Sequence, residues 1–284
     1  MIPSGLMSTA MFDIRELGPE IAGGSGCLLV NADDWGRDQP TTNRTLDCLR
    51  HKTVSAVSAM VFMVDSRRGA EIARAEGIDA GIHLNFTTPF SALECPSELR
   101  RRQGELISYL SRRPLNRVLF HPGLMSSFRY VYEAQMEEFQ RLFSRAPERI
   151  DGHHHMHLCS NILFAGMLPS GTMLRRNCSF DADEKSLLNR MYRKLVDRMI
   201  ARRHRIADFL FSLSPCEPIS RLQRIISLAS HRVVELEAHP VLSEEYNLLM
   251  SERILELLGR VPLLSFQDLR SNGIPRLHAS LASA

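Results

Sequence analysis

Short apolar runs of strand length recur along this chain and alternate with amphipathic segments of helix length. Such alternation is typical of repeated β-α units around a parallel sheet. The apolar runs predict strands near residues 27–32, 56–63, 79–84, 148–153, 172–176, 208–212, 232–238 and 262–266. The amphipathic segments predict helices near residues 40–52, 66–76, 126–146, 184–204, 219–230 and 244–258. Eight strands would complete a barrel, and 284 residues can bury one large core.

Four of the predicted strands end in acidic residues or histidine. The ends read Asn31-Ala32-Asp33-Asp34-Trp35-Gly36, Gly81-Ile82-His83-Leu84-Asn85, Asp151-Gly152-His153-His154-His155-Met156-His157 and Glu235-Leu236-Glu237-Ala238-His239-Pro240. The carboxyl ends of parallel strands meet at one edge of a sheet, where α/β proteins carry their catalytic groups. We therefore expect these side chains to share one site.

The histidine run indicates a metal site, because neutral imidazole is the commonest protein ligand of transition metals. In an extended segment His153, His155 and His157 would share one face, so this strand end would offer a metal one or two nitrogens. An exposed polar loop, or core histidines bonded to backbone carbonyls, are the alternatives.

The pair Asp33-Asp34 predicts a division of roles. Two adjacent ionised carboxylates repel each other, so keeping both near one point requires a cation. One acid would then bind the metal while the other moves a proton. A helix N-cap is the alternative, since Asp before Gly is also a turn signal. His83, taken alone, is more typical of a structural histidine than of a metal ligand.

In this order, the four strand ends resemble the YdjC-like (ChbG-like) carbohydrate deacetylases, which are metal-dependent hydrolases that remove acetyl groups from N-acetylated sugars. The resemblance covers about residues 26–270. It implies a single-domain α/β fold, a TIM-barrel-like (β/α) barrel that is irregular or incomplete. It also implies an N-acetylated sugar or oligosaccharide as the substrate and suggests a homodimer.

Carried over residue by residue, the resemblance makes Asp34, His83 and His153 the metal ligands, Asp33 the general base and His239 the general acid. It places the sugar-contacting or ligand-orienting side chains at Trp35, Asn85, His155, His157 and Glu237.

The chain departs from the family pattern in two places. Trp35 replaces the more usual Phe, and Val241 follows His239-Pro240 where Gly is usual. A complete His121-Pro122-Gly123 lies between the second and third motifs, and we interpret it as an unrelated turn.

Amide hydrolysis requires an activated water, stabilisation of the oxyanion and a proton for the departing amine. One divalent metal with three protein ligands would supply the first two. Two imidazoles and one carboxylate suit Zn, Mn, Co or Fe, and suit Mg less well because Mg prefers oxygen ligands.

Other classes of protein are weaker interpretations. Arg100-Arg101-Arg102, Arg112-Arg113, Arg175-Arg176 and Arg202-Arg203-His204-Arg205 could bind nucleic acid only if they formed one continuous face, and the net charge is only +3. A metal-dependent phosphoesterase would share His and Asp ligands, but it usually needs bridging carboxylates or a Gly-rich phosphate loop, and neither is evident.

The six cysteines form no Cys-x-x-Cys pair, which favours a reducing compartment. No signal sequence and no apolar run long enough to span a membrane is evident, so we expect a cytoplasmic protein. Residues 1–25 are expected to be a poorly ordered extension, and residues 271–284 a loose tail. The long segment 86–125 is expected to cover the substrate.

Overall fold

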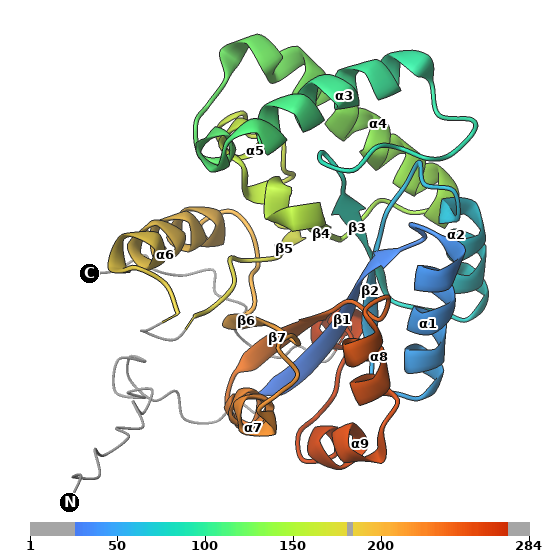
Figure 1. The fold of residues 1–284 in the computed structure, drawn as a ribbon, viewed down its shortest axis with the longest axis vertical. Helices are drawn as coiled ribbons and strands as arrows, with labels where there is room; N and C mark the ends of the chain where they lie inside the picture. The colour runs from blue at the N-terminus through green and yellow to red at the C-terminus, as the bar shows by residue number, and fades with distance from the viewer. Residues whose placement is uncertain (1–25, 181–183, 272–284) are drawn as a thin grey trace, which may run out of the picture.

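A computed structural model describes residues 26–180 and 184–271, and these residues form an α/β fold around one parallel sheet (Figure 1). The strand order is β5-β4-β3-β2-β1-β7-β6, and every pairing is parallel. The strands are β1 Cys27–Trp35, β2 Ala56–Ala59, β3 Ala80–Leu84, β4 Arg149–Gly152, β5 Met173–Leu174, β6 Phe209–Ser212 and β7 Val233–Ala238. All nine residues of β1 are buried, so this strand runs through the centre of the core.

Helices surround the curled sheet (Figure 1). They are α1 Gln39–Arg50, α2 Ser66–Ala75, α3 Ser97–Arg112, α4 Met125–Phe143, α5 Ser160–Phe164, α6 Leu187–Ala201, α7 Ile219–Leu228, α8 Ser243–Leu249, α9 Glu252–Leu258 and α10 Phe266–Ser271. Within the described residues, no helix is both long enough and apolar enough to cross a membrane.

The predicted α/β class and the incomplete barrel are confirmed. The two outermost strands of the sheet, β5 and β6, approach each other. Met173 of β5 forms an isolated parallel bridge with Arg205, which lies shortly before β6. The backbone N–H of Ser179 also donates to the carbonyl of Leu210 in β6 at 2.7 Å. These single contacts replace the regular ladder that would close a barrel.

The predicted eighth strand, 262–266, is wrong. Its only pairing among the described residues is an isolated bridge between Leu263 and Leu28, and α10 begins at Phe266. The predicted helix 244–258 is divided into α8 and α9, because Ser251 caps a new helix by accepting a hydrogen bond from the N–H of Ile254.

Segment 86–125, expected to cover the substrate, contains the helix α3, which packs on α4. The expected extension, residues 1–25, and residues 272–284 of the expected tail lie outside the described residues.

Strand register brings the functional side chains together. Asn31 of β1 aligns with Glu237 of β7, and His83 of β3 aligns with Asp151 of β4. Since the strands are parallel, their carboxyl ends lie along one edge of the sheet. The motifs that are far apart in the sequence therefore meet there.

Candidate active site

Asp33 and Asp34 both reach the site because β1 is irregular at this point. Neighbouring side chains of a regular strand point to opposite faces. The register of β1 against β2 shifts between Ala32 and Trp35, and Asp34 has a left-handed backbone conformation with φ 64°. Such a bulge redirects a side chain, and the strained backbone it requires is typical of functional sites. As a result both carboxylates lie within 4 Å of His83 Nε2, at 3.8 Å for Asp33 and 3.5 Å for Asp34.

Asp34, His83 and His153 converge on one point. Asp34 Oδ1 lies 2.9 Å from His153 Nδ1 and 3.5 Å from His83 Nε2. Ligand atoms bonded to one cation at about 2.0 to 2.3 Å are separated by about 3 to 3.8 Å. Asp34 Oδ1 and His83 Nε2 are buried and have no hydrogen-bond partner among the described residues. A buried polar atom normally has a partner, so these two atoms fit a divalent cation.

The charge of the buried site also fits a cation. Among the residues that the structure describes, five buried carboxylates lie at this edge of the sheet, and two buried guanidinium groups accompany them. The carboxylates are Asp33, Asp34, Asp151, Glu235 and Glu237, and the arginines are Arg149 and Arg175. Burial raises the pKa of Asp34, but the imidazoles of His153 and His83 outweigh this effect and hold it well below its usual range. Asp34 is therefore ionised and can bind a metal.

Asp151 holds His83 in position. His83 Nδ1 lies 2.7 Å from Asp151 Oδ1, and Asp151 Oδ2 accepts hydrogen bonds from Ser58 at 2.5 Å and Arg149 at 2.8 Å. A proton on Nδ1 leaves the lone pair of Nε2 directed at the metal position. Burial lowers the pKa of His83, but Asp33 and the other nearby carboxylates raise it to about 10 overall. The negative charge of these carboxylates around His83 also attracts cations.

Asp33 has a different environment, since Arg175 provides its positive charge. Arg175 donates to both Asp33 oxygens at 2.7 and 2.8 Å, and Asn31 donates to Asp33 Oδ1 at 2.8 Å. Burial raises the pKa of Asp33, but the charge of Arg175 outweighs burial and lowers the pKa overall. Arg175 also pairs with Glu235 at 2.7 Å and with Glu237 at 3.3 Å. The carboxylate of Asp33 is therefore ionised and rigidly oriented.

His239 approaches Asp33 from the loop after β7. Its Nε2 lies 3.9 Å from Asp33 Oδ2, and its side chain is 27% exposed. The backbone N–H of His239 donates to Glu245 in α8 at 2.5 Å, and Arg44 in α1 donates to the carbonyl of Val241 at 2.7 Å. These bonds hold the loop although Val241 replaces the usual glycine.

The histidine run is not extended, so the predicted alternation is wrong. Residues 153–158 form tight turns that are kinked at His154 and His155, which adopt left-handed backbone conformations with φ 54° and 58°. These turns send the rings in different directions. His154 is exposed and lies 3.0 Å from Thr87, whereas His155 lies beside Cys178 and Glu237.

His157, Trp35 and Asn85, which are predicted to contact the sugar or to orient a ligand, are each no more than 1% exposed. His157 Nε2 lies 2.9 Å from the carbonyl of Arg175, and burial lowers the pKa of His157 to about 3. Trp35 donates its indole N–H to the carbonyl of Gly69, while Asn85 Oδ1 accepts the N–H groups of Thr87 and Thr88. In this structure the three side chains support the walls and loops of the site and have no open surface.

His121 begins a short turn at Pro122–Leu124, and its ring packs against Tyr109. It is not among the residues that converge on the metal position.

The sequence analysis assigned no individual role in the site to Arg175, Asp151 or Arg37. Arg37 donates to Asp34 Oδ2 at 2.6 Å, which leaves Oδ1 facing the two imidazoles. Arg175 and Asp151 each lie at the carboxyl end of a predicted strand, and that position was the signal that could have identified them. Arg175 was instead counted with the surface arginines, although it is only 3% exposed.

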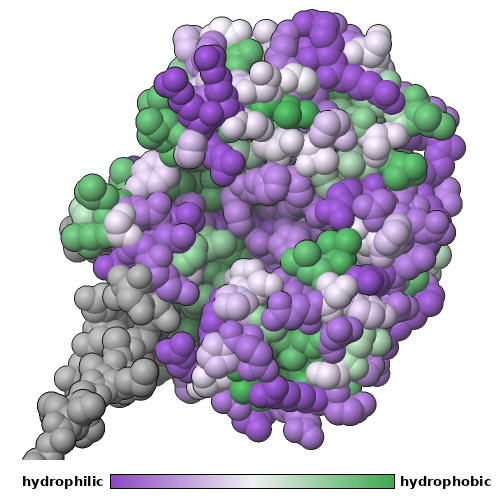
Figure 2. All heavy atoms as spheres, in the orientation of Figure 1, coloured by the Kyte–Doolittle hydropathy of each residue, from purple (hydrophilic) through white to green (hydrophobic). Residues whose placement is uncertain are grey.

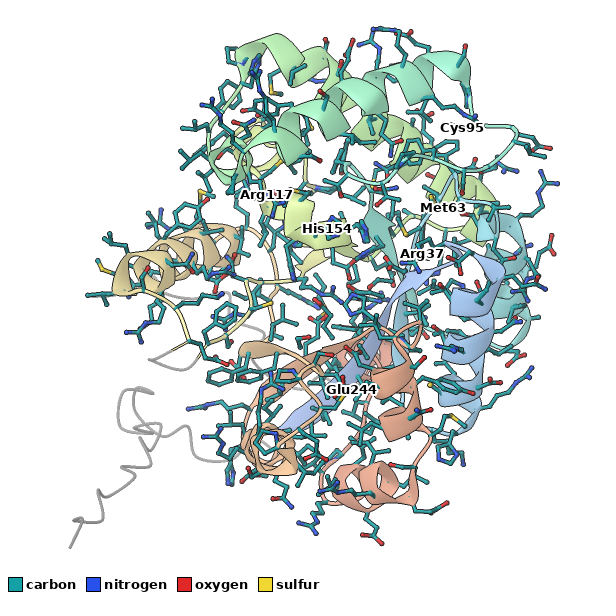
Figure 3. All side chains as sticks on the ribbon, in the orientation of Figure 1. Arg37, Met63, Cys95, Arg117, His154 and Glu244 are labelled. Atoms are coloured by element: carbon teal, nitrogen blue, oxygen red, sulfur yellow. The ribbon has the colours of Figure 1, made fainter. Side chains whose placement is uncertain are left out.

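The face that carries the site is hydrophilic and hollowed near its middle (Figure 2). Arg37 and His154 lie on this face, after the carboxyl ends of β1 and β4 (Figure 3). A separate groove of about 800 Å³ lies between α2, α4 and residues 92–99, and none of the predicted site residues lines it.

The chain is similar in sequence to known proteins. Chitooligosaccharide deacetylases of Yersinia pestis (strain Pestoides F) and Yersinia pseudotuberculosis serotype O:1b (strain IP 31758) are 34% identical to this chain over 138 residues. That match covers 48% of this chain and 52% of each relative, so the chain spans about half the length of the curated relatives it matches.

A solved structure from Enterococcus faecalis V583, named for cellobiose-phosphate cleavage, superposes with a TM-score of 0.60 at 18% identity. The superposition covers 86% of this chain and 99% of the Enterococcus faecalis chain, which shows that the two share a fold. The family described as YdjC-like protein matches residues 27–260, which include all five residues predicted for metal binding and proton transfer. The chain belongs to the YdjC-like protein family.

Proposed function

We propose that this chain is a metal-dependent carbohydrate deacetylase that hydrolyses the acetamido group of an N-acetylated sugar or oligosaccharide. The observation that carries the proposal is the convergence of Asp34 Oδ1, His83 Nε2 and His153 Nδ1 beside Asp33 and His239. The names of the Yersinia relatives support the reaction and the class of substrate.

A divalent metal held by Asp34, His83 and His153 would supply Lewis-acid activation of water and of the acetamido carbonyl. The donor set of two imidazoles and one carboxylate favours Zn, Mn, Fe or Co over Mg. Asp151 orients His83, and Arg37 holds the second oxygen of Asp34, so the ligand atoms are positioned before the metal arrives.

Asp33 acts as the general base. Its carboxylate is ionised, fixed by Arg175 and Asn31, and close to the metal position. His239 Nε2 lies 3.9 Å from Asp33 Oδ2 and its side chain is partly exposed, so it can deliver a proton to the sugar nitrogen. That proton lets the nitrogen leave as an amine.

The rival functions have less support. In a phosphoesterase with two metals, a carboxylate bridges the metals. Asp33 is the nearest candidate, but both of its oxygens are bonded to Arg175. The arginine runs do not act as one basic face, because Arg101 and Arg102 pair with Glu98 and Arg175 is buried. A cytoplasmic location and a homodimer remain proposals, and the six free cysteines support the first.

The test is acetate release from a panel of N-acetylated sugars and chitooligosaccharides. The expected result is release that stops after chelation and returns when Zn²⁺, Mn²⁺ or Co²⁺ is added. The same glycans without their N-acetyl groups serve as the control for contaminating acetate. Bound metal without acetate release from any of these glycans would contradict the proposal.

A further inference from the structure

His155, Cys178 and Glu237 form a second cluster beside the candidate active site. They come from three separate segments: the turn after β4, the chain after β5, and β7. His155 Nε2 lies 3.5 Å from Cys178 Sγ and 3.4 Å from Glu237 Oε2, and all three donor atoms lie within 4.8 Å of one another. The proposed mechanism uses none of these atoms.

The spacing of this cluster matches the ligand spacing of a small tetrahedral metal ion. Nitrogen, oxygen and sulfur ligands bound to Zn²⁺ at about 2.0 to 2.3 Å lie about 3.3 to 3.8 Å apart. The two separations measured from His155 fall in this range. The side chain of His155 is 31% exposed and Cys178 is half-buried, so a cation can enter from solvent.

Metal binding at this cluster would replace the thiol proton of Cys178, because metals bind the thiolate form of cysteine.

Arg175 should lower the affinity of this cluster for a cation below that of the site formed by Asp34, His83 and His153. Its Nη1 lies 3.3 Å from Glu237 Oε2, the same oxygen that faces His155. A cation must therefore share this carboxylate with a guanidinium group, and the two positive charges repel each other. Asp34 Oδ1 has no such competitor, because Arg37 bonds to the other oxygen.

We propose that His155, Cys178 and Glu237 form a second, weaker binding site for a thiophilic divalent cation such as Zn²⁺. On binding, a bond forms between the metal and Cys178 Sγ, and the thiol proton passes to solvent. No electron is transferred. This proposal of metal binding does not depend on whether the chain is a deacetylase.

Occupation of this site would also slow the reaction proposed above. Arg175 Nη1 contacts both Glu237 and Asp33. A metal that draws negative charge from Glu237 leaves Arg175 to pair more strongly with Asp33, and this weakens Asp33 as a base. Zinc in excess of the first equivalent should therefore inhibit turnover.

The test is a Co²⁺ titration of the chelated full-length chain, followed by absorption spectroscopy and by metal analysis after Zn²⁺ loading. A thiolate bound to Co²⁺ gives a near-ultraviolet charge-transfer band that histidine and carboxylate ligands do not give. We expect this band to develop after the first equivalent. Cys178→Ser should abolish it and lower the Zn²⁺ content by one ion per chain.

Two variants serve as controls. Cys95→Ser changes another buried cysteine, which lies just before α3 and outside the cluster, and should keep the band. His153→Ala removes a ligand of the first site and should also keep the band, which separates this proposal from the proposed function. A missing band in the wild-type protein, or a band that persists in Cys178→Ser, would overturn the proposal.

Discussion

Asp33 and Asp34 are neighbours in the sequence, but they have opposite surroundings. Asp33 is paired with a positively charged side chain, because Arg175 donates hydrogen bonds to both of its oxygens. Asp34 Oδ1 faces two imidazole nitrogens and has no hydrogen-bond partner within the described residues. The comparison teaches that two adjacent carboxylates differ by what surrounds each of them, and this difference supports the proposed roles of Asp34 as metal ligand and Asp33 as base.

The largest expected effect comes from Asp34→Ala. Removing the only carboxylate of the predicted ligand set should abolish metal binding and reduce turnover to background, because the proposed metal would provide Lewis-acid activation. Metal analysis and acetate release would be measured on the same preparation. Metal retained at the wild-type level would remove Asp34 from the ligand set.

Asp33→Asn should keep the metal and lose most of the activity. The amide still fills the position of the carboxylate, but it cannot accept a proton, and general base catalysis contributes about 100-fold to 10,000-fold. The measurement is turnover number together with metal content. Loss of metal equal to that of Asp34→Ala would show that the two carboxylates are not distinguished.

Asp151→Asn should destabilise the fold. Breaking one partner of a buried ionic network costs about 3 to 5 kcal/mol. Burial raises the pKa of Asp151, but Arg175, His83 and Arg149 lower it overall. Its contribution to stability is therefore complete above the unfolded-state pKa of about 3.9 and is lost as the pH falls toward the lower folded-state pKa. Urea unfolding at pH 7 and below pH 4 should show a difference from wild type that shrinks in acid.

Asp197→Asn is the matched control, since Asp197 is a buried carboxylate paired with Arg176 away from His83. Asp151→Asn should also weaken metal binding, because His83 loses its partner, whereas Asp197→Asn should leave metal affinity unchanged. A difference between wild type and Asp151→Asn that is the same at both pH values would contradict the ionic account of Asp151.

His239→Ala should keep the metal and slow hydrolysis about 100-fold, because the leaving amine loses its proton donor. The loss of activity should be smaller for an acetylated substrate whose leaving group is better than a sugar amine. Turnover of the N-acetylated sugar and of this second substrate would be measured for His239→Ala and the wild type. His121→Ala changes the other His-Pro pair of the chain and should have wild-type turnover, and equal losses in the two variants would contradict the role of His239.

Arg37→Gln should have the smallest effect. It frees the second oxygen of Asp34 and loosens the orientation of this ligand, so metal affinity should fall by about 10-fold while turnover at saturating metal changes little. Competition with a chromophoric chelator would measure the affinity. Arg68→Gln breaks a comparable pair with Asp65 and is the control. Equal affinity in all three proteins would show that Arg37 does not position Asp34.

Much of this site could be predicted because its signal is local. Asp33, Asp34, His83, His153 and His239 each end or follow an apolar run, and parallel strands bring such ends together.

The rest depends on tertiary structure. Arg175 follows an apolar run like the other site residues, but only the fold shows that it lies beneath Asp33 and not on the surface. The left-handed backbone of His154 and His155 breaks the expected alternation of side chains. The sequence did not predict this turn, because neither residue is a glycine, the residue that usually signals a left-handed conformation. Leu263 could not complete an eighth strand, because the chain turns into α10 after one bridge.

X-ray anomalous diffraction from crystals of the protein loaded with one equivalent of Zn²⁺ is the most direct test of the difference between the two carboxylates. We predict a single strong peak bonded to Asp34 Oδ1, His83 Nε2 and His153 Nδ1, with Asp33 still paired to Arg175. A peak bonded to Asp33, or Asp33 separated from Arg175 by the metal, would contradict the account.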